Sequence, residues 1–231
     1  MLANYKWFEA QRSISGSPRL IIRRLGLQDY EPIWNCMRYL SENPKRERLD
    51  EIWLLSHKPV FTQGQAGNDE HILATRNIPV LQTDRGGQVT YHGPGQLVGY
   101  ILLNVKRRKI GVRALVDILE RSMLETLSYY GIEAFTRPKA PGVYVKNAKI
   151  GALGLRIKNG WSYHGFSLNV DMDLAPFGYI NPCGFEGLAV TQIADHVGEL
   201  EVSAREVSGV LSNRLLVELG YKEQYDLLES S

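Results

Sequence analysis

Two alternating runs of apolar residues, joined by a short turn, are the strongest constraint on the fold of this chain. Residues 149–157 and 163–170 both place apolar side chains at every second position, a spacing typical of β-strands. The alternation puts His164 on the same face as Phe166. The turn, residues 158–160, reads KNG, and Asn-Gly pairs adopt the backbone angles of tight hairpins. The sequence therefore predicts an antiparallel hairpin.

Three other stretches have the apolar spacing of helices with one buried face: residues 28–42, 113–130 and 203–219. Gly131 follows the second stretch, where a left-handed C-terminal residue is often needed, and Ser203 begins the third with the S-x-x-E pattern of a capping box. Shorter strands are predicted over residues 20–25, 52–55, 60–61 and 97–103. Helices mixed with paired strands predict an α/β (α+β) fold, with a mixed β-sheet flanked by helices.

The chain is predicted to consist of a short arm and one domain. The turn-rich residues 13–18 separate an N-terminal arm, residues 1–19, from a single domain over residues 20–231. Of the 231 residues, 44% are hydrophobic, which is enough for a substantial core. Neither an internal repeat nor a linker divides the longer part.

The charge balance and the cysteine content exclude some classes of binding partner and indicate the cellular compartment. Lysine and arginine number 27 against 25 aspartate and glutamate, a balance too even for a general nucleic-acid binder. The uncharged residues 86–105 contain too many polar residues and glycines for a membrane span, and the first residues lack the apolar run of a signal peptide. Two cysteines cannot form the disulfide framework of a small secreted domain. We therefore expect a soluble cytoplasmic protein that binds neither nucleic acid nor membrane.

Two basic clusters, residues 45–48 and 106–109, are predicted to be solvated faces. Such faces can also attract an acidic partner protein toward a site.

A glycine-rich stretch, RGGQVTYHGPGQ at residues 85–96, predicts close approach between the backbone and another group. It lacks the GxxxxGK[ST] pattern and precedes an apolar strand rather than a helix, which argues against a nucleotide-phosphate loop. Two interpretations stay open: a loop lying flat against a long, thin apolar ligand, and a pair of tight turns that holds two strands together.

Cys183 is a candidate nucleophile because it lies in a loop, between Pro182 and Gly184, rather than on an apolar helix face as Cys36 does. A free thiol is only a few per cent ionised at neutral pH, so it needs a base or a nearby cation. Lys149, at the start of a predicted strand, could take the proton. The candidate histidines are His92, His164 and, less plausibly, His57, His71 and His196. From the residues alone, a structural cysteine and a solvated lysine remain alternatives.

The acidic residues do not form a recognisable metal site. Asp171 and Asp173 alternate, but an EF-hand would require glycine at Leu174 and glutamate at Ile180. Neither HExxH nor CxxC occurs. The sequence predicts no metal and no cofactor.

Five ordered motifs resemble the bacterial lipoyl(octanoyl) transferases of lipoate biosynthesis. They read HKPVFTQGQAG (57–67), RGGQVTYHGPGQLVGY (85–100), KIGALGLRI (149–157), YHGFSLNVDMDL (163–174) and INPCGFEGLAVTQI (180–193). The resemblance extends over residues 20–219 and contains no departure within the motifs. It does not cover the arm.

This resemblance implies the catalytic fold of biotin and lipoate protein ligases, and transfer of an octanoyl group from octanoyl-acyl carrier protein to a lysine of lipoyl domains. The acceptors implied are 2-oxoacid dehydrogenases and the glycine cleavage H protein. Cys183 would carry the acyl thioester and Lys149 would promote ionisation of its thiol. The resemblance also implies these acyl-site residues: Arg85, Gly86, Gly87, Gln88, Val89, Thr90, Tyr91, His92, Ala152, Leu153, Gly154, Gly165, Phe166 and Ser167. His92 is assigned to the pocket wall rather than to proton transfer.

Three other activities would use the same residues differently. An ATP-dependent lipoate or octanoate protein ligase would activate a free acid and would not need Cys183. A thioester hydrolase would pair Cys183 with His164 or His92 and use water as the acceptor. A binding module would hold an acyl chain or an acidic partner without forming a covalent adduct.

Overall fold

The computed structural model describes residues 19–43 and 48–228. The strands are β1 (Arg19–Gln28), β2 (Asp50–His57), β3 (Val60–Gln63), β4 (Val80–Gln82), β5 (Thr90–His92), β6 (Gln96–Leu102), β7 (Phe135–Arg137), β8 (Ala140–Val145), β9 (Ala148–Lys158), β10 (Trp161–Asn169) and β11 (Glu223–Leu228). The α-helices are α1 (Tyr30–Glu42), α2 (Val105–Arg108), α3 (Val112–Tyr129) and α4 (Ala204–Glu218). The 3-10 turns are η3 (Asp69–His71), η4 (Ala175–Tyr179), η5 (Pro182–Gly184) and η6 (Ile193–Asp195).

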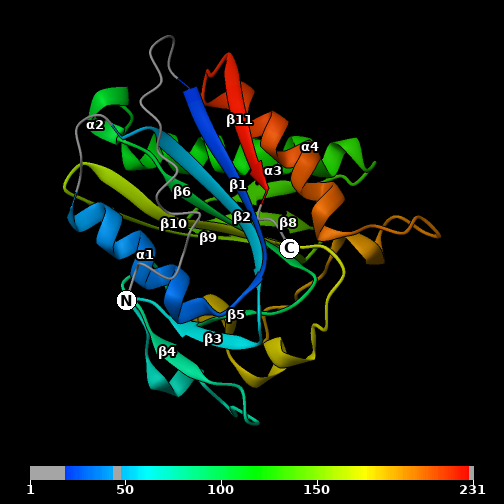
Figure 1. Cartoon of the computed structure of the whole chain (residues 1–231). Helices are drawn as coiled ribbons and strands as arrows, with labels where there is room; N and C mark the ends of the chain where they lie inside the picture. Colours follow the sequence, from blue (N-terminus) through cyan, green and yellow to red (C-terminus); the bar gives the residue numbers. More distant parts are fainter. Residues whose placement is uncertain (1–18, 44–47, 229–231) are drawn as a thin grey trace.

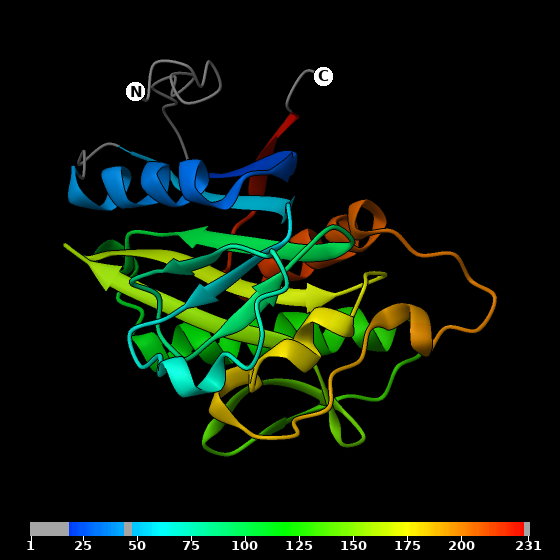
Figure 2. The ribbon, with the colours of Figure 1, turned by 90° about the horizontal axis from the view of Figure 1, so that it is seen from below.

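Within the described residues, eight strands form one mixed sheet in the order β11-β1-β2-β6-β10-β9-β8-β7. The strands β11, β1 and β2 are parallel, and the pairs from β2 through β7 are antiparallel. Helix α1 covers one face of the sheet, and α3 and α4 cover the other (Figures 1 and 2). This architecture confirms the predicted mixed sheet flanked by helices.

The predicted hairpin is formed by β9 and β10. Lys158 pairs with Trp161 across a two-residue turn, in which Asn159 and Gly160 have φ angles of 51° and 81°. The turn is therefore built from the two residue types that tolerate left-handed angles best. Within β10, however, the expected alternation is wrong at His164. Its φ of 57° interrupts the strand geometry and turns the ring away from the core face.

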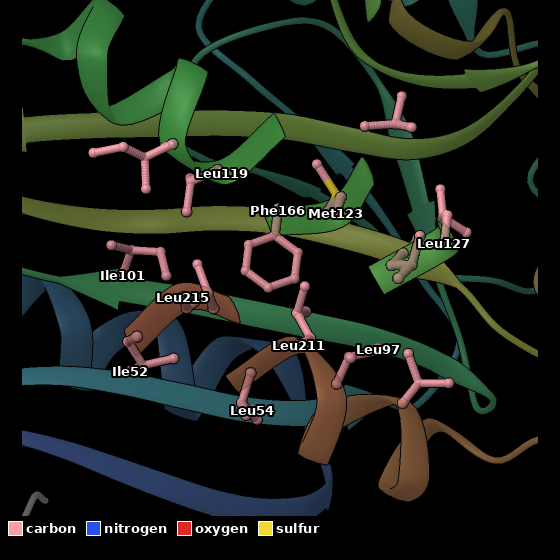
Figure 3. Close-up of a cluster of buried hydrophobic side chains, with 14 of the residues drawn as sticks. Ile52, Leu54, Leu97, Ile101, Leu119, Met123, Leu127, Phe166, Leu211 and Leu215 are labelled. Atoms are coloured by element: carbon pink, nitrogen blue, oxygen red, sulfur yellow. The ribbon is translucent and has the colours of Figure 1, made fainter. Parts of the chain in front are cut away.

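The predicted helices form with the expected boundaries. Gly131 follows α3 with a φ of +72°, and both hydrogen bonds of the capping box at Ser203 and Glu206 are present. The apolar side of α3 packs with α4 against the sheet around Phe166 (Figure 3). Gly99 lies opposite that ring, and a Cβ there would approach it to 2.1 Å, so this strand position has room only for glycine.

A second, smaller sheet of order β4-β3-β5 was only partly foreseen, because the sequence pattern indicated β3 alone. It lies beside the large sheet in Figure 1. The loop between β4 and β5 contains the first part of the glycine-rich stretch, residues 85–89, so the pairing of both strands with β3 fixes both ends of that loop.

Two other predictions concern the ends and the basic clusters. Arg19 begins β1, and the rest of the predicted N-terminal arm lies outside the described residues. The division into an arm and one domain therefore remains a prediction.

The prediction that the basic clusters are solvated is wrong at Arg48, whose side chain is 4% exposed and stacks over the Trp161 ring. Stacking on an indole ring and proximity to Glu51 stabilise the buried guanidinium.

Candidate functional site

A cavity of about 440 Å³ lies between the glycine-rich loop, the β9–β10 hairpin and the loop that contains η5. Most of the predicted acyl-site residues line it: Arg85, Gly86, Gly87, Gln88, Thr90, His92, Ala152, Leu153, Gly154, Gly165, Phe166 and Ser167. Cys183 and Lys149 also line it. Val89 and Tyr91 point away from the cavity, as the alternation along β5 requires, and pack with Phe61.

Cys183 and Lys149 are in direct contact. The Nζ atom of Lys149 lies 3.2 Å from the Sγ atom of Cys183, although the residues are 34 positions apart in the sequence. Lys149 is 5% exposed and Cys183 is partly exposed at the cavity. The contact therefore places an amine beside a cysteine sulfur at the cavity, an arrangement found where a cysteine acts as a nucleophile.

The strand β9 positions the amine. Lys149 Nζ also donates to the carbonyl of Pro141 at 3.1 Å, and it lies 5.3 Å from the centre of the Tyr144 ring. Its backbone N–H donates to Ala189, and its carbonyl accepts from Thr191. The chain just beyond Cys183 therefore holds the backbone of Lys149 in place.

The thiol is presented by an unusual backbone conformation. Cys183 has a φ of 56°, in the left-handed region, and its N–H donates to the carbonyl of Val89. Non-glycine residues in this region cost free energy, and such residues cluster at functional sites. Gly184, with a φ of +76°, continues the turn. Two successive left-handed residues therefore hold the thiol toward the cavity and Lys149.

The glycine-rich loop lies along the part of β9 that β8 does not cover. The N–H of Gly86 donates to the carbonyl of Leu155, and a Cβ on Gly154 would lie 2.9 Å from the carbonyl oxygen of Gly86. The glycines therefore permit backbone-to-backbone contact between this loop and β9, whereas contact with a ligand stays a prediction.

Arg85 holds this loop together from inside. Its guanidinium donates to Thr62 of β3 and to the carbonyls of Gly86 and Gln88. All these acceptors are uncharged, and burial lowers the pKa of the guanidinium. Arg85 is thus a buried cation in the cavity wall.

The second cysteine has the opposite environment. Cys36 is 0% exposed on the inner face of α1, and burial raises the pKa of its thiol to about 11. It is therefore a protonated core residue at neutral pH, whereas Cys183 lies at the cavity beside a cation.

A buried hydrogen-bond chain fixes the tautomer of His92. Asn169 donates to the carbonyl of Thr191 and accepts from Gln96 Nε2. The Oε1 atom of Gln96 therefore faces His92 Nδ1, which must donate. Burial lowers the pKa of His92 to about 3, so the ring is neutral near pH 7. A neutral ring of such low basicity agrees with a role in the pocket wall.

Asp84 anchors His164, the residue with the left-handed angle. Its carboxylate accepts from Trp34 Nε1 at 2.8 Å, from His164 Nε2 at 2.9 Å and from the hydroxyl of Tyr163. Burial alone would raise the pKa of Asp84. The three hydrogen-bond donors lower it by a larger amount, so the pKa of Asp84 lies below its usual value. Tethered in this way, His164 is held against the cavity wall but does not pair with Cys183.

The sequence of this site matches a known family. Residues 29–215, which include Lys149 and Cys183, match the family described as the lipoyl protein ligase A/B catalytic domain. The chain belongs to this family.

Curated relatives within the family narrow the type of reaction. A protein from Pseudomonas entomophila (strain L48), named octanoyltransferase, is 57% identical over 206 residues, which are 89% of this chain and 95% of the relative. An octanoyltransferase of Pseudomonas putida (strain W619) is 57% identical over 205 residues, 89% of this chain and 94% of the relative. This member of the family is accordingly an acyltransferase.

Solved structures of family members and of biotin ligases share the fold. Lipoate-protein ligase A bound with ATP superposes with a TM-score of 0.73 at 14% identity, covering 94% of this chain and 90% of the other. A putative lipoate protein ligase from T. acidophilum with bound lipoic acid gives 0.72 at 14% identity, covering 94% and 91%. Biotin protein ligase from Aquifex aeolicus gives 0.51 at 14%, covering 87% and 68%. At these identities the likeness establishes the fold alone.

Several cavity residues of this family member were not predicted from its sequence. They come from α1, α3, β6, the turn between β7 and β8, the start of β8 and the residue after η5: Tyr30, Val98, Tyr100, Val112, Val116, Lys139, Ala140, Pro141 and Phe185. Their apolar spacing indicated helix and strand faces, and no local signal distinguishes a cavity wall from a core.

The described residues contain no group of three or more metal-ligating side chains. Nor does any helix in residues 19–43 and 48–228 have the length and apolarity to span a membrane.

Stability of the fold should fall as the pH is lowered below neutrality, because two cavity-region histidines are buried in the neutral form. Burial lowers the pKa of His57 to about 4 and that of His92 to about 3. The unfolded chain binds these protons near pH 6.5, so between about pH 6.5 and pH 4 it binds more protons than the folded protein. The free energy of unfolding then falls by up to about 1.4 kcal/mol per pH unit for each histidine.

Urea unfolding at steps from about pH 7 to about pH 4.5 measures this slope. The matched variant His57→Gln keeps a donor for the carbonyl of Gln28 and an acceptor for the hydroxyl of Tyr100. It should show a shallower slope than the unmodified protein. Equal slopes for the two proteins would mean that His57 is not buried in its neutral form.

Proposed function

We propose that this chain transfers an octanoyl group from octanoyl-acyl carrier protein to the lysine ε-amine of a lipoyl domain, through an acyl thioester on Cys183. The reaction is a step in protein lipoylation. The acceptors we propose are the lipoyl domains of 2-oxoacid dehydrogenases and the glycine cleavage H protein. The observation that carries the proposal is the 3.2 Å contact between Lys149 Nζ and Cys183 Sγ at the cavity.

The cavity suits a straight acyl chain with its carbonyl at Cys183. Its walls include the bare backbone of Gly86, Gly154 and Gly165 together with the apolar side chains of Leu153 and Val98. Along β10, Ser167 and His164 both line the cavity and lie about 10 Å apart by the strand rise. A chain of eight carbons has a comparable length.

The first half-reaction moves the acyl group onto the protein. The ammonium of Lys149 stabilises the thiolate, whose sulfur attacks the carbonyl carbon of the donor thioester. The carbonyl π electrons move to oxygen, and collapse of the tetrahedral intermediate expels the thiol of acyl carrier protein, which takes its proton from Lys149. One thioester replaces another, so the step needs no activation by ATP.

The second half-reaction delivers the acyl group to the acceptor. The lipoyl-domain amine attacks the Cys183 thioester, an amide forms, and the sulfur of Cys183 leaves as thiolate. The amine that Lys149 became in the first step accepts the proton lost by the attacking nitrogen, which restores the ammonium. The same side chain thus acts as acid and then as base.

Intact-mass measurement after mixing the protein with octanoyl-acyl carrier protein, followed by a lipoyl domain, tests the proposal. We expect the mass of one octanoyl group on this chain, at the peptide that contains Cys183, and its later appearance on the lipoyl-domain lysine. Modification that requires octanoate and ATP instead would identify a ligase. Release of free octanoate without an acceptor would identify a hydrolase.

A further inference from the structure

The proposed reaction creates a negative charge that the dyad itself does not neutralise. When sulfur attacks the thioester, the carbonyl oxygen becomes an oxyanion, and enzymes stabilise it with hydrogen-bond donors already fixed in position. In many acyl-transfer sites these donors are backbone N–H groups next to the nucleophile.

The backbone N–H groups of the nucleophile, of the two residues after it and of Lys149 already have acceptors. The N–H groups of Cys183, Gly184 and Phe185 already donate to the carbonyls of Val89, Asn181 and Pro182, at distances of 3.1, 2.9 and 3.1 Å. The N–H of Lys149 donates to Ala189 at 2.8 Å. The first three bonds build the turn that presents the thiol and the fourth holds the lysine backbone, so recruiting any of these N–H groups would break a bond that positions the dyad.

The side-chain amide of Gln88 lies beside the residue that follows the nucleophile. Gln88 belongs to the glycine-rich loop and lines the cavity, and the next residue along, Val89, accepts the hydrogen bond from Cys183. A Cβ on Gly184 would lie 2.8 Å from Gln88 Nε2 and 3.3 Å from Oε1, so the amide packs against the residue that follows the nucleophile.

The side-chain amide of Gln88 has no hydrogen-bond partner among the described residues. Its buried Oε1 lacks a hydrogen-bond partner there, and Nε2 makes no hydrogen bond to residues 19–43 or 48–228. The backbone, by contrast, is fixed, because Arg85 Nη2 donates to the carbonyl of Gln88 at 2.6 Å. An amide that is unpartnered, packs against Gly184 and stands on a fixed backbone is available as a donor, since using it in a reaction breaks no existing hydrogen bond.

We infer that Gln88 is a catalytic residue whose Nε2–H donates to the carbonyl oxygen of the acyl group while that oxygen carries negative charge. This inference rests on the proposed function. The donor is needed twice, because a tetrahedral oxyanion forms when the thioester binds Cys183 and forms again when the amine attacks. No proton is transferred; the amide keeps its hydrogen throughout.

Gln88→Met tests the inference, because methionine has nearly the length of glutamine and lacks the N–H group. Acylation of Cys183 by octanoyl-acyl carrier protein, followed by intact mass in single-turnover time courses, should slow by about 10²–10³-fold. Alkylation of Cys183 by iodoacetamide should stay within about twofold of the unmodified protein, because that displacement has no carbonyl and forms no oxyanion. Gln88→Ala should behave in the same way, which excludes an effect of the methionine side chain itself.

Gln65→Met is the matched control. Gln65 is exposed on the loop behind the glycine-rich stretch, where it accepts from Arg156, and it does not line the cavity. It should acylate at the unmodified rate. Acylation of Gln88→Met at the unmodified rate would overturn the inference, as would an equal slowing of alkylation, which would assign Gln88 to the thiol instead. Failure of the unmodified protein to acylate at all would instead contradict the proposed function.

Discussion

Cys183→Ala is expected to take up no octanoyl group from octanoyl-acyl carrier protein and to leave the lipoyl domain unmodified. Without the sulfur no acyl thioester can form, and the cavity retains only its capacity to bind. Loss of the nucleophile in covalent catalysis costs on the order of 10⁴–10⁶-fold in rate. Intact mass of both proteins, sampled over hours, measures the effect.

Cys36→Ala provides the control for this variant. Its thiol is buried on the inner face of α1 and does not line the cavity, so octanoyl uptake should match that of the unmodified protein. Folding of Cys183→Ala is checked by its unfolding midpoint, which should be unchanged or higher because the thiol is partly exposed and makes no packing contact in the core. Lipoyl-domain modification by Cys183→Ala at a measurable fraction of the normal rate would rule out the thioester route.

Lys149→Met should give the second largest effect, because methionine retains much of the buried aliphatic stem and removes the charge. Two losses follow: the thiolate of Cys183 loses its cation, and both half-reactions lose their proton carrier. Removal of a general acid–base group costs about 10²–10⁴-fold. Overall transfer to the lipoyl domain should fall by that factor, and iodoacetamide alkylation near pH 7 should slow as well.

Alkylation separates a role in ionising the thiol from a structural role. The deficit of Lys149→Met should shrink as the pH is raised toward about 10, where a thiol ionises without help. Lys158→Met, at the other end of β9, removes an exposed lysine that pairs with Glu42 and should alkylate normally. A deficit of Lys149→Met that is the same at every pH would indicate a displaced thiol rather than a lost cation.

Local patterns predicted most of the regular structure. The turn of the β9–β10 hairpin, the end of α3 at Gly131 and the capping box at Ser203 all depend on interactions within about five residues, which sequence spacing records directly. Cys183 and Lys149 were candidates from their local sequence, but only the family resemblance favoured them over a structural cysteine and a solvated lysine. Their contact could not be identified from local sequence, since 34 residues separate them.

The predictions failed where contacts between residues far apart in the sequence determine the local structure. His164 leaves the alternation of β10 because Asp84, 80 positions earlier, binds its ring. Arg48 is buried because Trp161 provides a flat surface for its guanidinium. The walls contributed by Tyr30 and Val112 likewise depend on how the helices pack on the sheet, which periodicity does not specify.

The two backbone hydrogen bonds that hold Lys149 have a consequence for the folding of the chain. Because Ala189 and Thr191 hold the lysine backbone, this support of the amine depends on residues that lie beyond Cys183 in the sequence. Long-range contacts of this kind form late in folding. A partly folded chain in which residues 189–191 have not yet paired with β9 therefore lacks the backbone support that places the Lys149 amine beside Cys183.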